Sequence, residues 1–216
     1  IAGVVPREIL VHPVAAMKEL GSDAFLVTDT HWSDQGARAA AVEFAKTLGL
    51  DSQDVVNLFA NDRYRSEQIV GDLGCKLTPS RTSLTQRLDS YDLGDDIVYD
   101  NGLRSFGRIF VTRNPDALVD RTCLIFGSSS SYAMLKYASR LFGCVILVHT
   151  AGSLDPHLIA AVKPQFLVAQ TNARFVVRVP LLTYSVRDHL KKKVSVLTEE
   201  EREVVIANRV CTDEAW

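Results

Sequence analysis

The sequence predicts an α/β domain of three layers, with helices on both faces of a mainly parallel sheet. In the second half of the chain, short apolar segments of strand length alternate with helical segments, and the connections between them are short. This alternation is typical of a parallel sheet covered by helices. The chain has 216 residues, of which 47% are hydrophobic and 23% are charged. A chain of this size and composition can bury a core without disulfides or bound metal.

Three elements are expected near the start of the chain. Residues 12–20 predict a helix. Residues 24–28 (AFLVT) form a short apolar run, which predicts a buried strand. Ser33 is suited to cap a second helix, which would end at Gly49. The apolar residues of that second helix recur at helical spacing: Ala37, Ala40, Ala41, Phe44, Ala45 and Leu48.

Residues 51–107 are the least regular part of the sequence and hold most of its turn-forming and charged residues. They predict a helix followed by a long surface insertion with one or two short strands. Long irregular segments in compact domains are often functional loops. We therefore expect this insertion to shape the substrate groove.

From residue 108 onward, predicted strands and helices alternate regularly. Strands are expected at residues 108–112, 122–126, 145–149 and 166–170. Helices are expected over residues 132–142 and after Asp155, where that residue can cap and Pro156 can occupy the first turn. The charged tail after Asp188 predicts a helix or a loose appendage. We expect residues 1–180 to form the domain, and residues 181–216 to be a C-terminal extension of the same domain.

Composition narrows the classes of partner. The 24 basic residues are balanced by 26 acidic ones, which argues against a nucleic-acid-binding protein. No apolar run reaches the roughly 18 residues of a membrane span, and the first ten residues lack the pattern of a secretory signal. Four cysteines show no metal-like spacing: Cys75, Cys123, Cys144 and Cys211. Nor do the five histidines, and HExxH is absent, so no catalytic metal is expected.

Two places in the sequence are suited to chemistry. Asp29 and His31 follow the predicted strand 24–28, and the ends of strands are where open α/β sheets place ligands. An aspartate two residues from a histidine can hold one imidazole tautomer and leave the other nitrogen as a base. Residues 127–131 (GSSSS) lie between a predicted strand and a helix, where backbone amides and the helix dipole favour an oxyanion. The alternatives are a structural helix cap and hydrogen-bonding histidine, and a plain turn or phosphate cradle.

Four segments resemble the alginate O-acetyltransferase family of the AlgX/AlgJ type. Residues 28–40 (TDTHWSDQGARAA) resemble its TDTHW-x-x-x-GA segment, and residues 124–133 (LIFGSSSSYA) resemble its serine motif. Residues 71–79 and 163–176 match weaker segments. The resemblance implies an SGNH-hydrolase-like (flavodoxin-like) domain in a circularly permuted motif order, because the Asp–His pair precedes the serine.

The resemblance also assigns roles to residues. It implies Ser129 as nucleophile, His31 as base and Asp29 as the residue that orients the base. An oxyanion hole would be built from the amides of Ser129 and Gly152 and from the side chain of Asn172. The plain alternative for Gly152 and Asn172 is that each is an ordinary turn residue.

Substrate contacts are expected from Trp32 and Arg174. Trp32 either packs against the helix that follows it or stacks on a sugar. The sequence departs from the family pattern at Ser128, where an aspartate is often found, and at Ala173, where the family has a glutamate before the arginine. The second departure affects the expected specificity and leaves the triad intact.

The resemblance implies a polysaccharide O-acetyltransferase that uses no cofactor. An acetyl group would pass from an external donor through an acyl-serine to the hydroxyls of an exopolysaccharide or a cell-envelope glycan. A membrane-bound partner would supply the acetyl group, in the periplasm or another extracytoplasmic compartment. The alternatives are an SGNH-type carbohydrate acetylesterase and a non-catalytic glycan-binding or assembly domain. Labelling of Ser129 by a fluorophosphonate would separate an enzyme from a binding domain.

Overall fold

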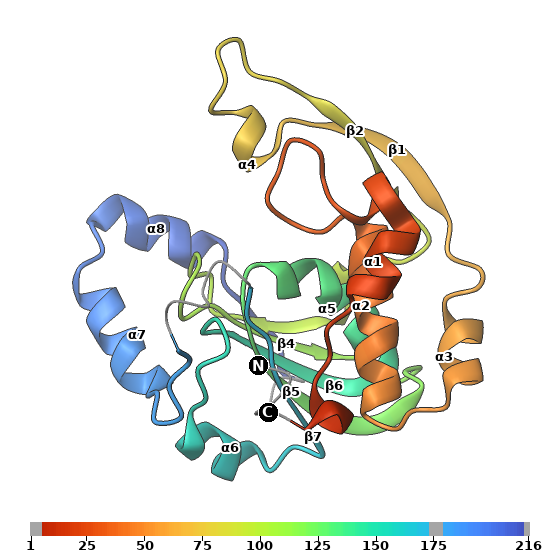
Figure 1. Cartoon of the computed structure of the whole chain (residues 1–216). Helices are drawn as coiled ribbons and strands as arrows, with labels where there is room; N and C mark the ends of the chain where they lie inside the picture. Colours follow the sequence, from red (N-terminus) through yellow and green to blue (C-terminus); the bar gives the residue numbers. More distant parts are fainter. Residues whose placement is uncertain (1–5, 173–178, 214–216) are drawn as a thin grey trace.

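The computed structural model describes residues 6–172 and 179–213. Its main sheet has the strand order β7-β5-β6-β4-β3-β8 within these residues (Figure 1). The strands of this sheet are β3 (Ile97–Asp100), β4 (Ile109–Arg113), β5 (Val119–Gly127), β6 (Phe142–His149), β7 (Phe166–Ala169) and β8 (Val210–Cys211). A separate antiparallel pair is formed by β1 (Tyr64–Ile69) and β2 (Ser83–Leu88). The class predicted from the sequence, α/β, is confirmed.

The main sheet is mixed, so the prediction of a mainly parallel sheet is wrong. Strand β5 is parallel to β6 and β7, but β4 is antiparallel to β6, and β3 and β8 extend the sheet by further antiparallel pairs. The reason is the length of the connections. A parallel pairing needs a crossover of about a dozen residues or more, whereas β3 and β4 are joined by residues 101–108 alone.

Helices cover both faces of the sheet, as predicted. On one face, α2 (Asp34–Thr47) and α5 (Ser130–Leu141) pack over buried residues of β5 and β6. On the other face, α6 (Pro156–Val162) and α7 (Val186–Ser195) cover a smaller apolar cluster. The larger cluster includes Ala41, Phe44, Cys123, Ile125, Leu135, Val145 and Leu147, and the smaller one includes Leu124, Phe126, Val148 and Val186.

The predicted helix caps are confirmed. The Ser33 hydroxyl accepts the Gly36 amide at 3.0 Å at the start of α2, which ends at Thr47, two residues before Gly49. The carboxylate of Asp155 accepts two amides of the first turn of α6, where Pro156 is the first residue. Each cap satisfies N–H groups that have no partner inside the helix. The expected helix over residues 12–20 is α1 (Val14–Leu20).

Residues 24–28 do not form a strand. A 3-10 helix (Gly21–Ala24) runs into a turn, and Phe25 bridges Trp32 in isolation. The segment pairs with its own continuation: the Leu26 amide donates to the His31 carbonyl at 3.1 Å. Ala24 and Leu26 are buried, but Phe25 and Val27 are 50% and 72% exposed, so only part of the apolar run is buried as predicted. Asp29 and His31 therefore lie on a self-paired loop rather than at the end of a sheet strand.

Residues 51–107 begin with a helix, as predicted, but they contain three short strands (β1, β2 and β3), one more than the prediction allowed. Helix α3 (Ser52–Leu58) precedes the strand pair β1–β2, and the connection between those strands carries α4 (Gly71–Gly74). We call residues 64–88 the β1–β2 arm. In Figure 1 the arm extends past the main sheet, and α4 lies beside the loop that precedes α2. The carbonyl of Thr28 accepts the amides of Leu73 and Gly74 at 3.0 and 2.9 Å, which fastens the arm to that loop.

A buried carboxylate joins the two helices that flank the candidate site. Asp34, in the first turn of α2, is fully buried, and its Oδ2 accepts Lys136 Nζ of α5 at 2.9 Å. The same oxygen accepts the Leu88 amide of β2 at 2.7 Å. Because a buried charge needs a partner, this contact fixes α2, α5 and the arm relative to one another.

Up to residue 213, the C-terminal segment forms helices and a short strand. After α7 come α8 (Glu199–Ala207), which begins with a capping box between Thr198 and Glu201, and β8, which pairs with the edge strand β3. Val186 of α7 is buried in the smaller apolar cluster. Among the helices of the described ranges, none has the length and apolar character needed to cross a membrane.

Candidate active site

Asp29, His31 and Ser129 are brought together from two distant parts of the chain. His31 lies between the other two: its Nδ1 is 2.5 Å from Asp29 Oδ1, and its Nε2 is 2.8 Å from Ser129 Oγ. The serine is 98 residues from the histidine and immediately precedes α5. This is the arrangement of a Ser–His–Asp triad, in which one imidazole nitrogen faces the carboxylate and the other faces the hydroxyl.

The carboxylate of Asp29 is surrounded by donors. Its Oδ1 accepts the His31 backbone amide at 3.0 Å as well as the ring, and its Oδ2 accepts the Asp72 amide at 3.0 Å. Partial burial acts to raise the pKa of Asp29, but the hydrogen bonds from His31 and Asp72, with the charge of His31, together hold that pKa below its ordinary value. Asp29 is therefore ionised at neutral pH, as its predicted role beside His31 requires.

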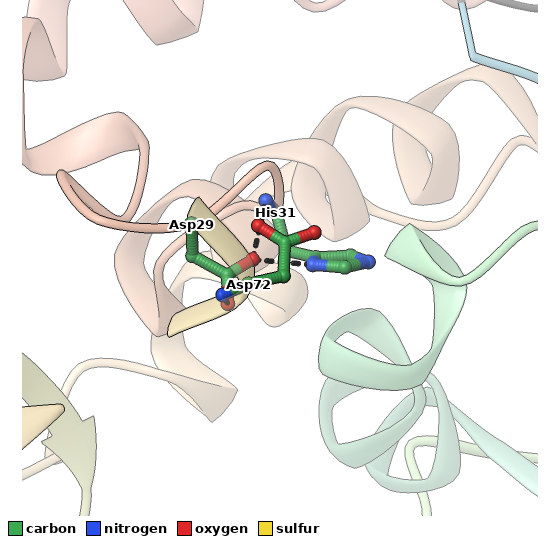
Figure 2. Close-up of side chains that lie close together, drawn as sticks. All are labelled: Asp29, His31 and Asp72. Carbon is green, nitrogen blue, oxygen red and sulfur yellow. Dashed lines mark hydrogen bonds and ion pairs between the residues drawn. The ribbon is translucent and has the colours of Figure 1, made fainter. Parts of the chain in front are cut away.

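Asp72 is a member of this site that the sequence interpretation missed. It comes from α4 of the arm, and Figure 2 shows it beside Asp29 and His31. Its side chain accepts the Thr30 amide at 2.8 Å and the Thr30 hydroxyl at 2.5 Å. Asp72 thus anchors the loop through both the backbone amide and the side-chain hydroxyl of Thr30. The atoms of Asp29, His31 and Asp72 that could ligate a metal lie within 4.8 Å of one another. The hydrogen bonds that join these three residues account for the short distances.

Gly71 allows α4 to approach the loop. Its φ is +68°, and a Cβ at this position would lie 2.2 Å from the Thr28 carbonyl oxygen and 2.8 Å from Asp29 Cβ. We expect Gly71→Ala to push the Asp72 amide away from Asp29 and to slow fluorophosphonate labelling of Ser129 at least about tenfold, a loss of some 1.4 kcal/mol. The measurement is the labelling rate followed by mass spectrometry.

Gly49 provides a matched control for this variant. It has a φ of +82°, but a Cβ there would meet nothing within 4 Å. Gly49→Ala therefore carries the backbone strain without the clash, and it should cost about 1 kcal/mol of unfolding free energy with an unchanged labelling rate. Equal labelling rates in the two variants would show that the close approach of α4 is unimportant for the site.

Ser129 lies where the N-terminus of α5 meets the end of β5. The side chain is partly accessible, whereas Ser128 and Ser130 on either side of it are buried. The amides at the start of a helix are not used within it, and the helix dipole favours negative charge there. The Ser129 amide is therefore in a position suited to oxyanion stabilisation.

Two further turns adjoin this serine turn. The Gly127 carbonyl accepts the amides of Thr150 and Ala151 at 2.9 and 2.7 Å, which places the turn containing Gly152 against it. Gly152 itself is buried and has a φ of +92°. A Cβ on Gly152 would lie 3.4 Å from the Gln170 carbonyl oxygen, so the third turn packs directly on the second. The predicted oxyanion residues thus come from neighbouring turns, and their role stays a prediction.

Asn172 belongs to the third turn and contacts the residue before the nucleophile. Its Oδ1 accepts the Ser128 hydroxyl at 3.1 Å and Gln170 Nε2 at 2.9 Å. Gln170 is the second residue that the sequence interpretation missed. The only signal for it was its position at the end of a predicted strand, followed by a polar turn.

Of the two residues predicted to contact the substrate, Trp32 lies within the described residues and Arg174 does not. Trp32 is partly buried and packs against the larger apolar cluster, which accords with the packing interpretation. A contact between Trp32 and a sugar stays a prediction. Arg174 and Ala173 lie outside the described residues.

Comparison with known families gives one match. The family model of the SGNH hydrolase-like domain of the acetyltransferase AlgX matches residues 9–91. This segment contains Asp29, His31 and Asp72, and it ends before Ser129. A sequence search of curated proteins found no match.

Comparison with solved structures gives matches of low sequence identity. A DHHW family protein from Eubacterium siraeum matches with a TM-score of 0.58 and 15% identity, over 81% of this chain and 70% of that chain. PatB1 of Bacillus cereus matches with a TM-score of 0.49 and 13% identity, over 76% of this chain and 65% of that one. The O-acetyltransferase domain of Pseudomonas putida AlgJ matches with a TM-score of 0.42 and 17% identity, over 85% of this chain and 66% of that chain. The chain spans just under two thirds of the length of PatB1 and of the AlgJ domain. The match to the DHHW family protein shows a shared fold.

Proposed function

We propose that this chain is a serine O-acetyltransferase, because residues 9–91 match the family model of the SGNH hydrolase-like domain of the acetyltransferase AlgX. The observation that carries the proposal is the alignment of Asp29, His31 and Ser129 through contacts of 2.5 and 2.8 Å. The acceptor we propose is a hydroxyl of an exopolysaccharide or cell-envelope glycan, and the donor an acetyl ester or thioester presented outside the cytoplasm by a membrane-bound partner.

The first half-reaction acylates the serine. His31 Nε2 takes the proton of Ser129 Oγ as that oxygen attacks the acetyl carbonyl carbon of the donor. The imidazolium that forms is stabilised by the ionised carboxylate of Asp29. The tetrahedral intermediate then collapses: the bond to the donor's leaving group breaks, and that group departs with the proton from Nε2.

The second half-reaction reverses the roles. The acceptor hydroxyl gives its proton to His31 Nε2 and attacks the carbonyl of the acetyl-serine. The bond to Ser129 Oγ breaks, and the serine recovers the proton. In both steps the carbonyl oxygen becomes an anion, which the amides of Ser129 and Gly152 and the Asn172 side chain would stabilise. One such donor is worth about 10²–10³-fold in rate.

Hydrolysis is the second candidate, and the exposure of Ser129 favours it. Because the side chain is partly accessible, water can reach an acetyl-serine and release free acetate. The same residues would then act as a carbohydrate acetylesterase.

The experiment that separates these functions is an acceptor assay. The protein is incubated with 4-nitrophenyl acetate, with and without an oligosaccharide, and the products are identified by mass spectrometry. We expect acetylated oligosaccharide with the wild type and none with Ser129→Ala. Free acetate alone across a panel of acceptors would favour the esterase. Absence of ester turnover and of acyl-serine would leave a glycan-binding or assembly domain as the function.

A further inference from the structure

The side chain of Gln170 reaches from the end of β7 to the turn that carries Ser129. Its Oε1 accepts the Ser128 amide at 2.8 Å, the Ser128 hydroxyl at 2.7 Å and the Ser131 hydroxyl at 2.9 Å. Its Nε2 donates to Asn172 Oδ1 at 2.9 Å and to the Thr171 carbonyl at 3.2 Å. One side chain thus contacts both the residue before the nucleophile and a predicted oxyanion donor.

These contacts fix which way the Gln170 amide faces. A backbone N–H can only donate, so the atom 2.8 Å from the Ser128 amide must be the oxygen of Gln170. The NH2 group of Gln170 then faces Asn172, and only the oxygen of Asn172 can accept from it. The NH2 group of Asn172 is therefore the end that is turned away from Gln170.

Burial makes this orientation firm. Ser128 and Ser131 are almost completely buried, with exposures of 0% and 1%. Buried donors require an acceptor, because water does not replace one that is lost. Reversing the Gln170 amide would place an NH2 group against the buried Ser128 amide, which can only donate and would lose its acceptor, so the reversed state is strongly disfavoured.

We propose that Gln170 is a positioning residue that fixes the Asn172 amide with its NH2 end available to the oxyanion. It acts through Asn172 and does not touch the substrate. The proposal rests on the acyl-transfer function above, which makes the oxyanion the group to be stabilised. The orientation itself is a property of the resting protein and is tested separately.

Gln170→Glu separates the positioning role from the structural one. A carboxylate accepts the three donors from Ser128 and Ser131 as the amide does, so the turn retains its acceptor. It has no NH2 group for Asn172 and faces the Asn172 oxygen with a negative charge, which favours reversal of the Asn172 amide. We expect kcat for 4-nitrophenyl acetate to fall about 10²–10³-fold, as on loss of one oxyanion donor, with KM and the thermal midpoint close to wild type.

Gln165→Glu is the matched control. Gln165 precedes β7 at its other end, and its Oε1 likewise accepts a backbone amide, that of Thr122, at 2.8 Å. This variant introduces the same charge on the same strand, and its kcat should be unchanged. A kcat for Gln170→Glu within about twofold of the Gln165→Glu value would overturn the proposal.

A double variant tests whether Gln170 acts through Asn172. Once Asn172→Ala has removed the donor, adding Gln170→Glu should lower kcat by less than about threefold more. If the factors by which the two single variants lower kcat multiply in the double variant, Gln170 acts independently of Asn172 and the proposal fails.

A neutron crystal structure tests the orientation without any turnover, because neutrons distinguish an NH2 group from an oxygen. In the wild type, Asn172 should present its oxygen to Gln170 Nε2, and in Gln170→Glu it should present its NH2 group to the new carboxylate. An unchanged Asn172 amide in the variant would overturn the positioning role even if the chain proves not to be an acyltransferase. Conversely, a wild type with the expected orientation but no serine-dependent turnover would reject the proposed function alone.

Discussion

Ser129→Ala should lower the rate of 4-nitrophenyl acetate cleavage by about 10³–10⁶-fold, the range typical of a lost nucleophile in a Ser–His–Asp triad. No acyl-serine can form without Oγ, and His31 loses the group it deprotonates. The fold should survive, because the hydroxyl that the variant removes is partly accessible and its hydrogen bond to His31 is worth about 0.5–1.5 kcal/mol. For a chain of this size, the thermal midpoint should move by only a few degrees.

Ser130→Ala is the matched control for this result. It removes a hydroxyl from the next residue of the same turn, which is buried and lies outside the triad. It should retain activity and should not affect labelling of Ser129 by a fluorophosphonate. Comparable residual activity in the two variants would contradict the assignment of the nucleophile.

Asp29→Asn should lower kcat by about 10⁴-fold while changing KM little. An asparagine amide can occupy the same space, but it stabilises the wrong imidazole tautomer and gives no charge to balance the imidazolium. Steady-state kinetics with the activated ester measure the effect. Asp72→Asn is the control, because it keeps the backbone amide that Asp29 accepts; its loss should be far smaller. Similar losses in both would mean that the loop held by Asp72 matters more than the charge on Asp29.

Asp29→Asn should also change how the free energy of unfolding depends on pH. The pKa of Asp29 is lowered in the folded state, so its ionised form stabilises the fold above its ordinary pKa of about 3.9. That contribution disappears as the pH falls through the lower folded-state pKa. The wild type should therefore unfold at a higher denaturant concentration than Asp29→Asn at pH 7, and the difference should shrink below about pH 4. A difference that is constant with pH would show that the carboxylate is not stabilised by its surroundings.

The parts of the fold that the sequence predicts are those with local causes. The caps at Ser33 and Asp155 depend on residues within three positions of them, and both occur as expected. The position of Ser129 between a strand and a helix is likewise local. The sheet partner of β4 was not predictable, because β4 pairs with β6, which comes later in the chain, rather than with the next strand, β5.

The apolar run at residues 24–28 was misinterpreted for a related reason. Hydrophobicity predicts burial, but a strand also needs a partner, and this segment bonds to residues 31–33 of its own loop. Asp72 and Gln170 were missed because their contacts join residues about 40 positions apart. A single polar residue in a turn does not reveal which distant group it meets.

The proposed base and the proposed nucleophile are held in place by different hydrogen-bonded sheets. His31 is held by the β1–β2 arm through Thr28, Asp29 and Asp72, whereas Ser129 follows β5 of the main sheet. Among the described residues no strand of one sheet pairs with a strand of the other, so the 2.8 Å contact between His31 and Ser129 joins loops that are held by two different sheets. A sequence change where the arm contacts this loop can therefore move His31 relative to Ser129, while the buried contact of Asp34 with Lys136 and Leu88 keeps the arm joined to α5. Under the proposed function, we expect such changes to alter the choice of acceptor while the strand pairing that positions Ser129 is kept.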